Sequence, residues 1–349
     1  NNFSWAQPTN MPGFVNSLRF ANAINEAATN SGQNAIFSDA TIERIIQYQK
    51  DPVNTPSMVA DPRDPNGWGY WNQGHANTDW WDVLYKDFAF SQRHNVGISG
   101  SSKSTNFYVG LGWLSDAGKF NFANEKFDRF NLASNLSLKV SDRLTFFLKA
   151  KFNRSYQNYL IAQDVNNRHQ VFGMMAISWP TDPVYTPNGD FALDKNLPGV
   201  LQNGGSDKQY TADLWFNPSV QLQLNKDWKL NADLSYNFYG YKRGHHRAVV
   251  WGLATDGVTP IRHYSQNWNR MSQQVTHNEY ITSNLYTDYS KQLGRHYFSV
   301  LLGGQAELSN NMLLSGWRRD LVTESVPSIR TAIGAMEVLD NMSHWSTLG

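Results

Sequence analysis

The sequence predicts an all-β protein, namely an antiparallel transmembrane β-barrel portion with short periplasmic turns and long extracellular loops carrying short helices. Three observations lead to this prediction. Apolar and polar residues alternate over long segments, short and long connections alternate between these segments, and most segments run 12 to 15 residues. Strands of soluble sheets average about 5–6 residues, whereas a tilted strand needs about 9–11 to cross a bilayer.

The alternation is clearest in residues 228–238. Six apolar residues, from Trp228 to Phe238, alternate there with five polar ones. Because successive side chains of a strand point to opposite faces, this pattern predicts a strand with one apolar and one polar face. Weaker versions of the pattern complete the set of candidate strands: 93–101, 104–115, 127–140, 143–156, 211–225, 228–240, 274–290 and 294–308. Pro218 predicts a bulge or break in one of them, because proline cannot donate to a strand ladder.

The connections between these strands predict how they are arranged. The connections near residues 102, 142, 226 and 292 are tight, and those over 116–126, 157–210, 241–273 and beyond 310 are longer. In an up-and-down sheet this alternation places every tight turn at one end and every long loop at the other. Outer-membrane barrels have this asymmetry, with long loops on the extracellular side.

We expect residues 1–92 to contain the end of a preceding strand, followed by a long extracellular loop region with two short helices. Apolar residues at helical spacing over 14–28 predict the first helix, which ends near Gly32. The second begins after Ser38, a predicted N-cap, and ends before Pro52. Residues 93–349 are then expected to form part of a barrel.

Composition excludes several other classes of protein. The chain has 30 Lys plus Arg and 29 Asp plus Glu, a net charge of +1, which argues against a nucleic-acid partner. Cysteine is absent, so zinc–thiolate sites and cysteine nucleophiles are excluded. The nine histidines show no metal-ligand spacing, and adjacent His245 and His246 would point to opposite faces of a strand. We therefore expect no metal and no cofactor.

Several short motifs, in order, resemble the SusC/RagA family of TonB-dependent outer-membrane transporters. The longest is TDWWDVLYKDFAFSQRHNVGISG over 78–100, which precedes NFYVGLGWL over 106–114 and FDRFNL over 127–132. QPTNMP over 7–12, NEAATNSG over 25–32 and PTDPVYTPNGD over 180–190 fit the same family. The similarity covers roughly the whole chain and is densest over 1–190.

The resemblance implies a middle portion of a larger barrel in the outer membrane of a Gram-negative, Bacteroidetes-type bacterium, surrounded by outer-membrane lipid. The family's plug domain and TonB-contacting segment have no counterpart in this sequence. It further implies uptake of oligosaccharides or peptides, coupled to the TonB complex through the missing N-terminal part, with a SusD-like lipoprotein as partner. The resemblance gives the chain no catalytic residues, and we expect no enzyme.

Two groups of residues are candidates for function. Trp68, Tyr70 and Trp71 could contact substrate or partner, because flat aromatic rings stack on sugar faces; packing of the loop onto the barrel rim is the structural alternative. The second group is the polar strand face, which we expect to face the lumen, where it could line a substrate path or contact the plug. Its members are Asn131, Asn135, Lys149, Lys151, Lys229, Asn231 and Asp233.

A different class of function remains open on the residues alone. A soluble β-rich carbohydrate-binding or carbohydrate-active domain would also show alternating strands and exposed aromatic rings. The apolar faces discriminate the two hypotheses. Leu132, Leu148 and Leu234 would face lipid in a barrel and a second sheet in a soluble domain.

Overall fold

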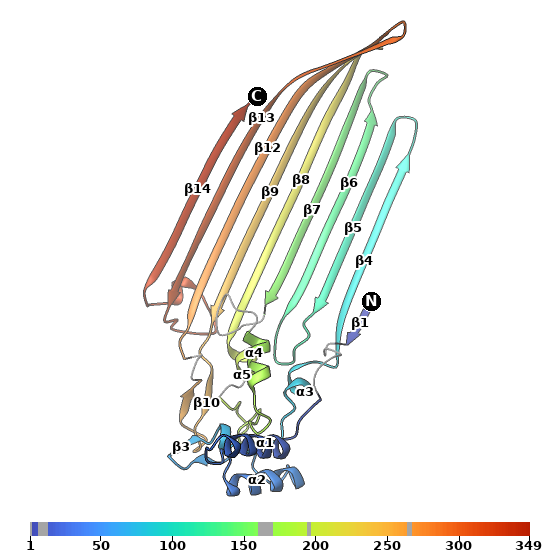
Figure 1. The fold of residues 1–349 in the computed structure, drawn as a ribbon. Helices are drawn as coiled ribbons and strands as arrows, with labels where there is room; N and C mark the ends of the chain where they lie inside the picture. The colour runs from blue at the N-terminus through green and yellow to red at the C-terminus, as the bar shows by residue number, and fades with distance from the viewer. Residues whose placement is uncertain (1, 6–12, 160–169, 194–196, 264–266) are drawn as a thin grey trace.

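The computed structural model describes residues 2–5, 13–159, 170–193, 197–263 and 267–349. Within these residues, ten strands form one antiparallel sheet in the order β1-β4-β5-β6-β7-β8-β9-β12-β13-β14 (Figure 1). The strand bounds are β1 Asn2–Trp5, β4 Phe88–Ser101, β5 Thr105–Ala117, β6 Lys126–Lys139, β7 Leu144–Tyr159, β8 Gly205–Asn225, β9 Trp228–Arg247, β12 Arg270–Leu293, β13 His296–Arg319 and β14 Met336–Leu348. β1 and β14 are the two edges, so the sheet is open over the described residues.

The turns and loops are segregated at opposite ends of the sheet, as the connection lengths predict. Residues 102–104, 140–143, 226–227 and 294–295 are the tight turns, and all lie at the end shown at the top of Figure 1. Gly294, in the last of them, has φ +61°, a left-handed conformation that glycine adopts without steric cost. The longer connections lie at the other end. We call their described residues, 13–87, 118–125, 170–193, 197–204, 248–263, 267–269 and 320–335, the loop layer.

The loop layer contains short helices and two small hairpins. The helices are α1 Ser17–Asn30, α2 Asp39–Lys50, α3 Trp80–Leu84, α4 Gln170–Ile177 and α5 Leu197–Asn203, with 3-10 turns η1 Trp71–Gln73 and η2 Ile329–Thr331. The hairpins pair β2 Ala60–Asp61 with β3 Asp64–Trp68, and β10 Trp251–Leu253 with β11 Pro260–Arg262. No described helix is long and apolar enough to cross a membrane.

Local sequence signals explain where α1 and α2 begin and end. The Asn16 side chain accepts a hydrogen bond from the Arg19 N–H (2.9 Å), and Ser38 Oγ accepts one from the Thr41 N–H (3.3 Å). These caps satisfy N–H groups that lack a partner inside the helix. After α1 the chain turns at Gly32, whose φ of +76° is a left-handed conformation. The two helices pack through Ala21, Phe37 and Ile45, which are buried.

The structure differs from the sequence-based expectation at Pro218. β8 continues through this residue, so the expected bulge or break is wrong. The ladder between β8 and β9 omits Asn217 and Pro218 but resumes in the same register, and Ser235 Oγ donates to Asn217 Oδ1 across the gap (2.8 Å). Proline therefore removes local pairing without shifting the strand. The register shift lies instead between Gln223 and Asn225, next to the turn.

The helix caps allow a first test. Replacing Ser38 by Ala removes the acceptor for the Thr41 N–H, which should destabilise α2 by about 1 kcal/mol. Amide hydrogen exchange over residues 39–45 of the full-length protein should speed up, while exchange over α1 stays unchanged. Ser38→Asp keeps an acceptor and should exchange like the wild type. Identical protection in S38A and the wild type would contradict this role of Ser38.

The loop layer should also loosen in acid. His263 is fully buried, and burial together with the nearby Arg247 charge lowers its pKa to about 4. When the loop layer unfolds locally, His263 is exposed and its pKa returns to about 6.5, so the unfolded loop layer binds a proton that the folded one does not. The folded loop layer therefore loses stability as the pH falls from 6.5 to 4. The loss is roughly 3 kcal/mol.

Limited proteolysis of the loop layer at pH 5 and pH 7.5 measures this loss. We expect faster cleavage at pH 5 in the wild type and a smaller pH effect in His263→Gln. His296→Gln, at the exposed turn on the opposite end of the sheet, is the matched control and should behave like the wild type. An unchanged pH effect in H263Q would show that His263 does not control opening.

Candidate functional site

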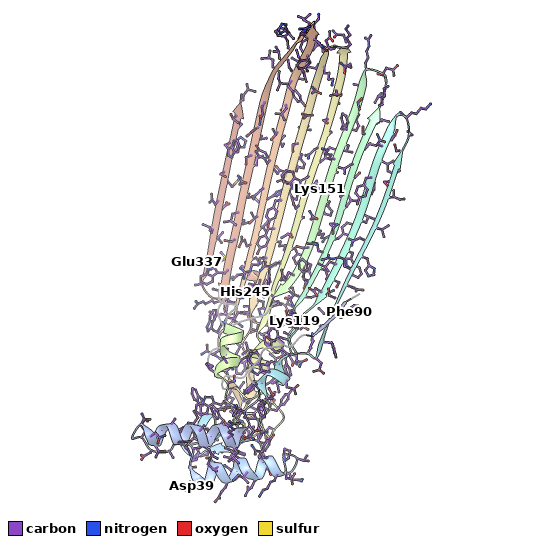
Figure 2. All side chains as sticks on the ribbon, turned by 45° about the vertical axis from the view of Figure 1, so that its right-hand side comes forward. Asp39, Phe90, Lys119, Lys151, His245 and Glu337 are labelled. Atoms are coloured by element: carbon purple, nitrogen blue, oxygen red, sulfur yellow. The ribbon has the colours of Figure 1, made fainter. Side chains whose placement is uncertain are left out.

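One face of the sheet is predominantly polar and can be followed from β6 to β12 through the strand register. Residues directly opposite each other in antiparallel strands share a face. Asn135 lies opposite Lys149, Lys149 opposite Asn217, and Lys151 opposite Trp215. The ladder continues through Ser219 to Asp233 and on to Asn284. The seven residues expected to face the lumen all lie on this face, and Figure 2 labels Lys151 partway along it.

The opposite face is predominantly apolar. Leu132 lies opposite Phe152 and Leu111, and Leu148 lies opposite Leu136. Leu234 belongs to the same face of β9, and its side chain is 41% exposed. Further exposed large apolar side chains on this face include Val96, Ile98, Phe216, Leu285 and Leu314. No second layer of described helices or strands covers this face in Figure 1.

Side-chain hydrogen bonds tie the polar face together. Gln221 Nε2 donates to Asn231 Oδ1 (3.1 Å), and Asn237 Nδ2 donates to Asp213 Oδ1 (3.1 Å). Nearer the loop layer, Arg243 donates two bonds to the carboxylate of Asp207, both at 2.8 Å. These bonds satisfy polar groups that would otherwise need water, and they hold the face in a defined arrangement.

Two connections about a hundred residues apart dock to build the centre of the loop layer. The Ala76 N–H donates to the Thr181 carbonyl (3.0 Å), and the Thr78 N–H donates to the Pro180 carbonyl (2.8 Å). A Cβ at Gly74 would lie 2.5 Å from the Thr181 carbonyl oxygen, so this close approach requires glycine. The docking fixes residues 74–78 against the segment that follows α4.

The aromatic residues around this contact differ in burial and in hydrogen bonding. Trp80 is buried and its Nε1–H donates to the Trp179 carbonyl (2.8 Å). Trp68 is also buried and donates to the Leu253 carbonyl (3.0 Å), which ties β3 to β10. The Tyr70 hydroxyl accepts from the Leu193 N–H (2.9 Å). Trp71 is different, because 42% of it is exposed and its ring meets that of Trp179 edge-on at 5.6 Å.

Of the three aromatic candidates, the structure thus uses Trp68 and Tyr70 to join segments of the loop layer and leaves Trp71 at its surface. Trp71 also has φ +60°, an uncommon conformation for a residue with a side chain. Its N–H donates to Asp182 Oδ1 (3.1 Å). The turn that presents the ring is therefore held by the segment on which residues 74–78 dock.

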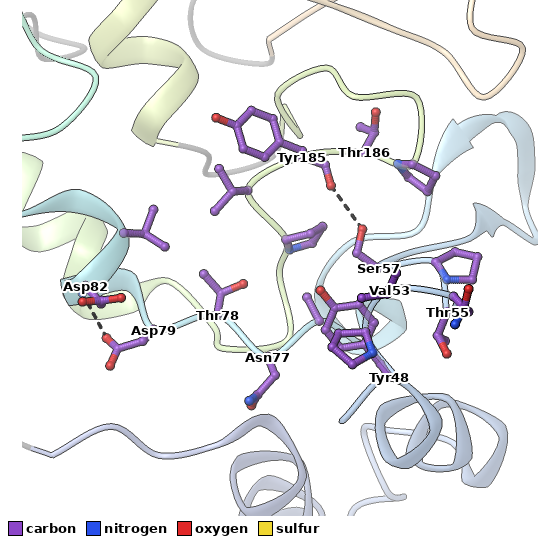
Figure 3. A pocket seen from close by; sticks show the side chains of 18 residues that line it. Tyr48, Val53, Thr55, Ser57, Asn77, Thr78, Asp79, Asp82, Tyr185 and Thr186 are labelled. Atoms are coloured by element: carbon purple, nitrogen blue, oxygen red, sulfur yellow. Dashed lines mark hydrogen bonds between the residues drawn. The ribbon is translucent and has the colours of Figure 1, made fainter. Parts of the chain in front are cut away.

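A groove of about 720 Å³ opens beside the docked segments (Figure 3). Its walls come from Tyr48 of α2 with residues 52–57, from residues 76–79 with Asp82 and Val83 of α3, and from residues 183–187. Ser57 Oγ donates to the Tyr185 carbonyl (3.1 Å) and connects two of the walls. The lining alternates prolines with hydroxyl and amide groups, so the groove offers both flat apolar surface and hydrogen-bonding partners.

The groove has two carboxylates, Asp79 and Asp82, and the first of them has a structural role. Asp79 is the N-cap of α3 and accepts from the N–H groups of Trp81 (3.0 Å) and Asp82 (3.3 Å). His75 lies behind the groove, with Nε2 2.7 Å from the Pro56 carbonyl, and burial lowers its pKa. Its neutral ring serves the packing of the loop. Among the described residues, no group of three or more His, Cys, Asp or Glu could hold a metal ion.

The sequence analysis missed a group of arginines where the polar face meets the loop layer. Arg247, Arg270 and Arg319 end or begin three neighbouring strands, and the register places Arg270 directly opposite both of the others. We call these three residues the arginine row. It lies at the end of β9 that Figure 2 marks with His245. Arg247 and Arg270 are 23 residues apart in sequence, and Arg270 and Arg319 are 49 apart. Only the strand register shows that they are neighbours.

The guanidinium groups of the arginine row make cation–π contacts with two tryptophans, Trp268 and Trp317. The guanidinium carbon of Arg247 lies 4.0 Å from the centre of the Trp268 ring, and that of Arg319 lies 4.7 Å from it. Arg270 lies 5.7 Å from the ring centres of both Trp268 and Trp317. Each such contact contributes about 0.5–2 kcal/mol, depending on how far it is shielded from water.

The chain is similar in sequence to one known protein and in fold to several solved structures. No protein-family model matches the sequence. The chain is 29% identical over 252 residues to the TonB-dependent receptor SusC of Bacteroides thetaiotaomicron, an alignment that covers 67% of this chain and 24% of SusC. The chain thus spans about a quarter of the length of this relative.

Solved structures of the RagAB peptide transporter share the fold. One superposes with a TM-score of 0.67, and the open-open and closed-closed states of the RagAB peptide importer give 0.66 and 0.65. Each comparison covers 99% of this chain and 38% of the other, at 12% identity, so it bears on the fold alone. The open ten-stranded sheet therefore has the fold of part of these structures. The chain is thus similar in sequence to part of SusC and in fold to part of the RagAB structures.

Proposed function

We propose that the protein containing this chain is an outer-membrane, TonB-dependent importer that takes up oligosaccharides, or else peptides. One observation supports this proposal most strongly: a single continuous sheet has one apolar and one polar face, with every long connection at one end. In a bilayer a sheet of this kind must close with further strands, so that each backbone group is hydrogen-bonded. Residues 93–349 would supply part of that barrel.

The apolar face is the proposed contact with lipid. An uncovered face of this size is unusual on a soluble protein, where large apolar patches mark interaction sites. Residues such as Leu132, Leu148 and Leu234 would lie against hydrocarbon. The polar face would then line the lumen, and its Lys149, Lys151 and Asp233 would contact either the plug or passing substrate.

The loop layer is the proposed extracellular surface. It carries the exposed Trp71 and the groove, and substrate and a SusD-like lipoprotein would arrive there. A flat indole supplies apolar area for a sugar face or a partner side chain at little entropic cost. The carboxylates there cap helices or join loops, which supports a transporter and not an enzyme.

A pair of neighbouring residues tests the membrane orientation. Leu234 and Asp233 are adjacent in β9 and point to opposite faces, and this chain has no cysteine to interfere with labelling. In lipid vesicles, a fluorophore on Leu234→Cys should be quenched by a lipid-soluble quencher, whereas one on Asp233→Cys should be largely protected. Protection of both labels would favour the soluble carbohydrate-binding alternative.

Energy coupling is tested by uptake. Cells that carry the full-length protein should accumulate a labelled oligosaccharide or peptide that the purified protein binds, and loss of TonB should abolish the accumulation. Deleting the surface lipoprotein that co-purifies with the protein should lower uptake at low substrate concentration. Uptake that persists at the same rate without TonB would instead indicate a passive channel.

Trp71 provides a test of the extracellular surface. Trp71→Ala should weaken binding of the imported substrate about tenfold, because the ring's apolar contact is lost. Trp228→Ala is the matched control: it removes a tryptophan of similar exposure, 41% against 42%, at the opposite end of the sheet. Calorimetry on the purified protein measures both. Equal affinity in W71A and the wild type would exclude Trp71 from the binding surface.

A further inference from the structure

A second groove lies on the apolar face of the sheet, toward the loop layer. It has a volume of about 420 Å³ and crosses β7, β8, β9 and β12, which are neighbours in the sheet (Figure 1). Ala212 and Gly240 lie opposite each other in its middle. Arg154 lies opposite Ala212 on one side, and His277 lies opposite Gly240 on the other. Two small residues between two large side chains leave this face hollow. We call this hollow the sheet groove.

The sheet groove combines apolar and cationic side chains. Phe152 and Phe238 line it on the side toward the tight turns, and the Phe238 ring meets that of His277 edge-on at 4.7 Å. Tyr210 and Lys242 line it on the side toward the loop layer. Tyr210 lies directly opposite Lys242, so the cation stands beside an aromatic ring on the same face. The groove therefore changes from apolar to charged along the direction of the strands.

The two cations of the sheet groove are available to a ligand. Arg154 and Lys242 are exposed, and within the part of the chain that the structure describes neither side chain forms an ion pair or a hydrogen bond. Among the described residues, none that lines the groove is acidic. Glu279 lies 4.0 Å from the His277 ring, outside the lining, and accepts a hydrogen bond from the Tyr236 hydroxyl (3.1 Å). The positive charge in the groove is therefore not neutralised there.

The position of the sheet groove along the strands corresponds to the edge of a hydrocarbon layer. Trp228 and Tyr289 meet edge-on at 6.4 Å at the tight-turn end, and Tyr156 and Tyr210 lie 4.9 Å apart beside the groove. Outer-membrane barrels carry aromatic residues at both borders of their apolar band. A tilted strand crosses a bilayer in about 9–11 residues, and Lys242 lies 14 positions after Trp228. In a membrane, the cations of the groove would thus lie at the level of lipid headgroups.

We propose that the sheet groove binds a phosphate-bearing lipid of the extracellular leaflet, with its phosphates on Arg154 and Lys242. These residues stand two strands and two residue steps apart, roughly 12 Å between Cα atoms, so their long side chains can reach one headgroup from opposite sides. Both kinds of cation bind phosphate. A free phosphate ion would leave Phe152 and Phe238 unused, whereas a lipid would contact them with its acyl chains. This inference rests on the proposed membrane orientation and adds a lipid partner.

Native mass spectrometry of the purified full-length protein in detergent tests the lipid site. The probes are lipid A with two phosphates, phosphatidylcholine as a lipid without net charge, and inorganic pyrophosphate as a phosphate without acyl chains. We expect lipid A to bind at least tenfold more tightly than either of the others. Arg154→Gln and Lys242→Gln should each weaken lipid A about tenfold, since a hydrogen bond between charged groups is lost.

Matched variants separate charge from shape and from folding. Arg154→Lys keeps the charge but not the paired donors, so its affinity should fall between those of wild type and R154Q. Ala212→Phe fills the groove without removing a cation and should also weaken lipid A. Lys103→Gln removes an exposed charge at a tight turn on the opposite end of the sheet and should bind like the wild type. R154Q and K242Q change exposed side chains, so their unfolding temperatures should match that of the wild type.

Three results would overturn the proposal. They are equal binding of lipid A and phosphatidylcholine, unchanged lipid A affinity in both R154Q and K242Q, and pyrophosphate that binds as tightly as lipid A and displaces it. The membrane orientation is read separately, from the label on Leu234→Cys. Quenching of that label without selective lipid A binding would leave the import function standing and remove only the lipid site. Protection of the label would count against the barrel itself, and the lipid site would fall with it.

Discussion

The structure depends on strand pairing that keeps one register across the sheet from β4 to β14. Since side chains alternate every residue, a slip of one position would turn the apolar face of a strand toward the polar side. Within the large sheet, the ladder shifts register only between Gln223 and Asn225, beside a turn where few residues are affected. The separation of an apolar from a polar face, and with it the proposed membrane orientation, follows from that continuity.

The same register brings distant residues together in a way that no local sequence signal shows. Arg247, Arg270 and Arg319 are unremarkable in the chain, each beside a long connection, yet they become neighbours because β9, β12 and β13 end at the same level. The loop layer depends on the sheet in a similar way. Residues 74–78 contact Thr181 because one connection leads into β4 and the other follows β7, and both lie at the same end of the sheet.

Much of the fold was predictable from local patterns. The alternation in 228–240 corresponds to β9, and Ser38 caps α2 as its position suggested. The observed strands extend beyond the expected ranges, with β8 beginning at Gly205 and β12 at Arg270, because these ends carry polar or glycine residues and lack clear alternation. β14 and the β10–β11 hairpin were missed, because β14 lacks clean alternation and the strands of the hairpin are only three residues long each.

The candidate site was less predictable for a physical reason. Composition and spacing identify aromatic residues but not their burial. Trp68 and Trp71 look equivalent in sequence, yet one is buried at a contact with Leu253 and the other is exposed. The polar face was accessible to prediction because it repeats with period two, whereas the arginine row requires the pairing of three strands.

The contact between Trp68 and Leu253 joins residues 185 positions apart, and the one between Thr255 and Pro65 joins residues 190 apart. Contacts this remote in sequence form late, since closing so long a stretch of chain costs entropy that only preassembled strands can reduce. Pro65 and Trp68 precede β4 in the chain but can reach these two contacts only after β4 through β9 have formed. They must therefore remain without their native partners, in need of protection from aggregation and proteolysis, until the sheet is built.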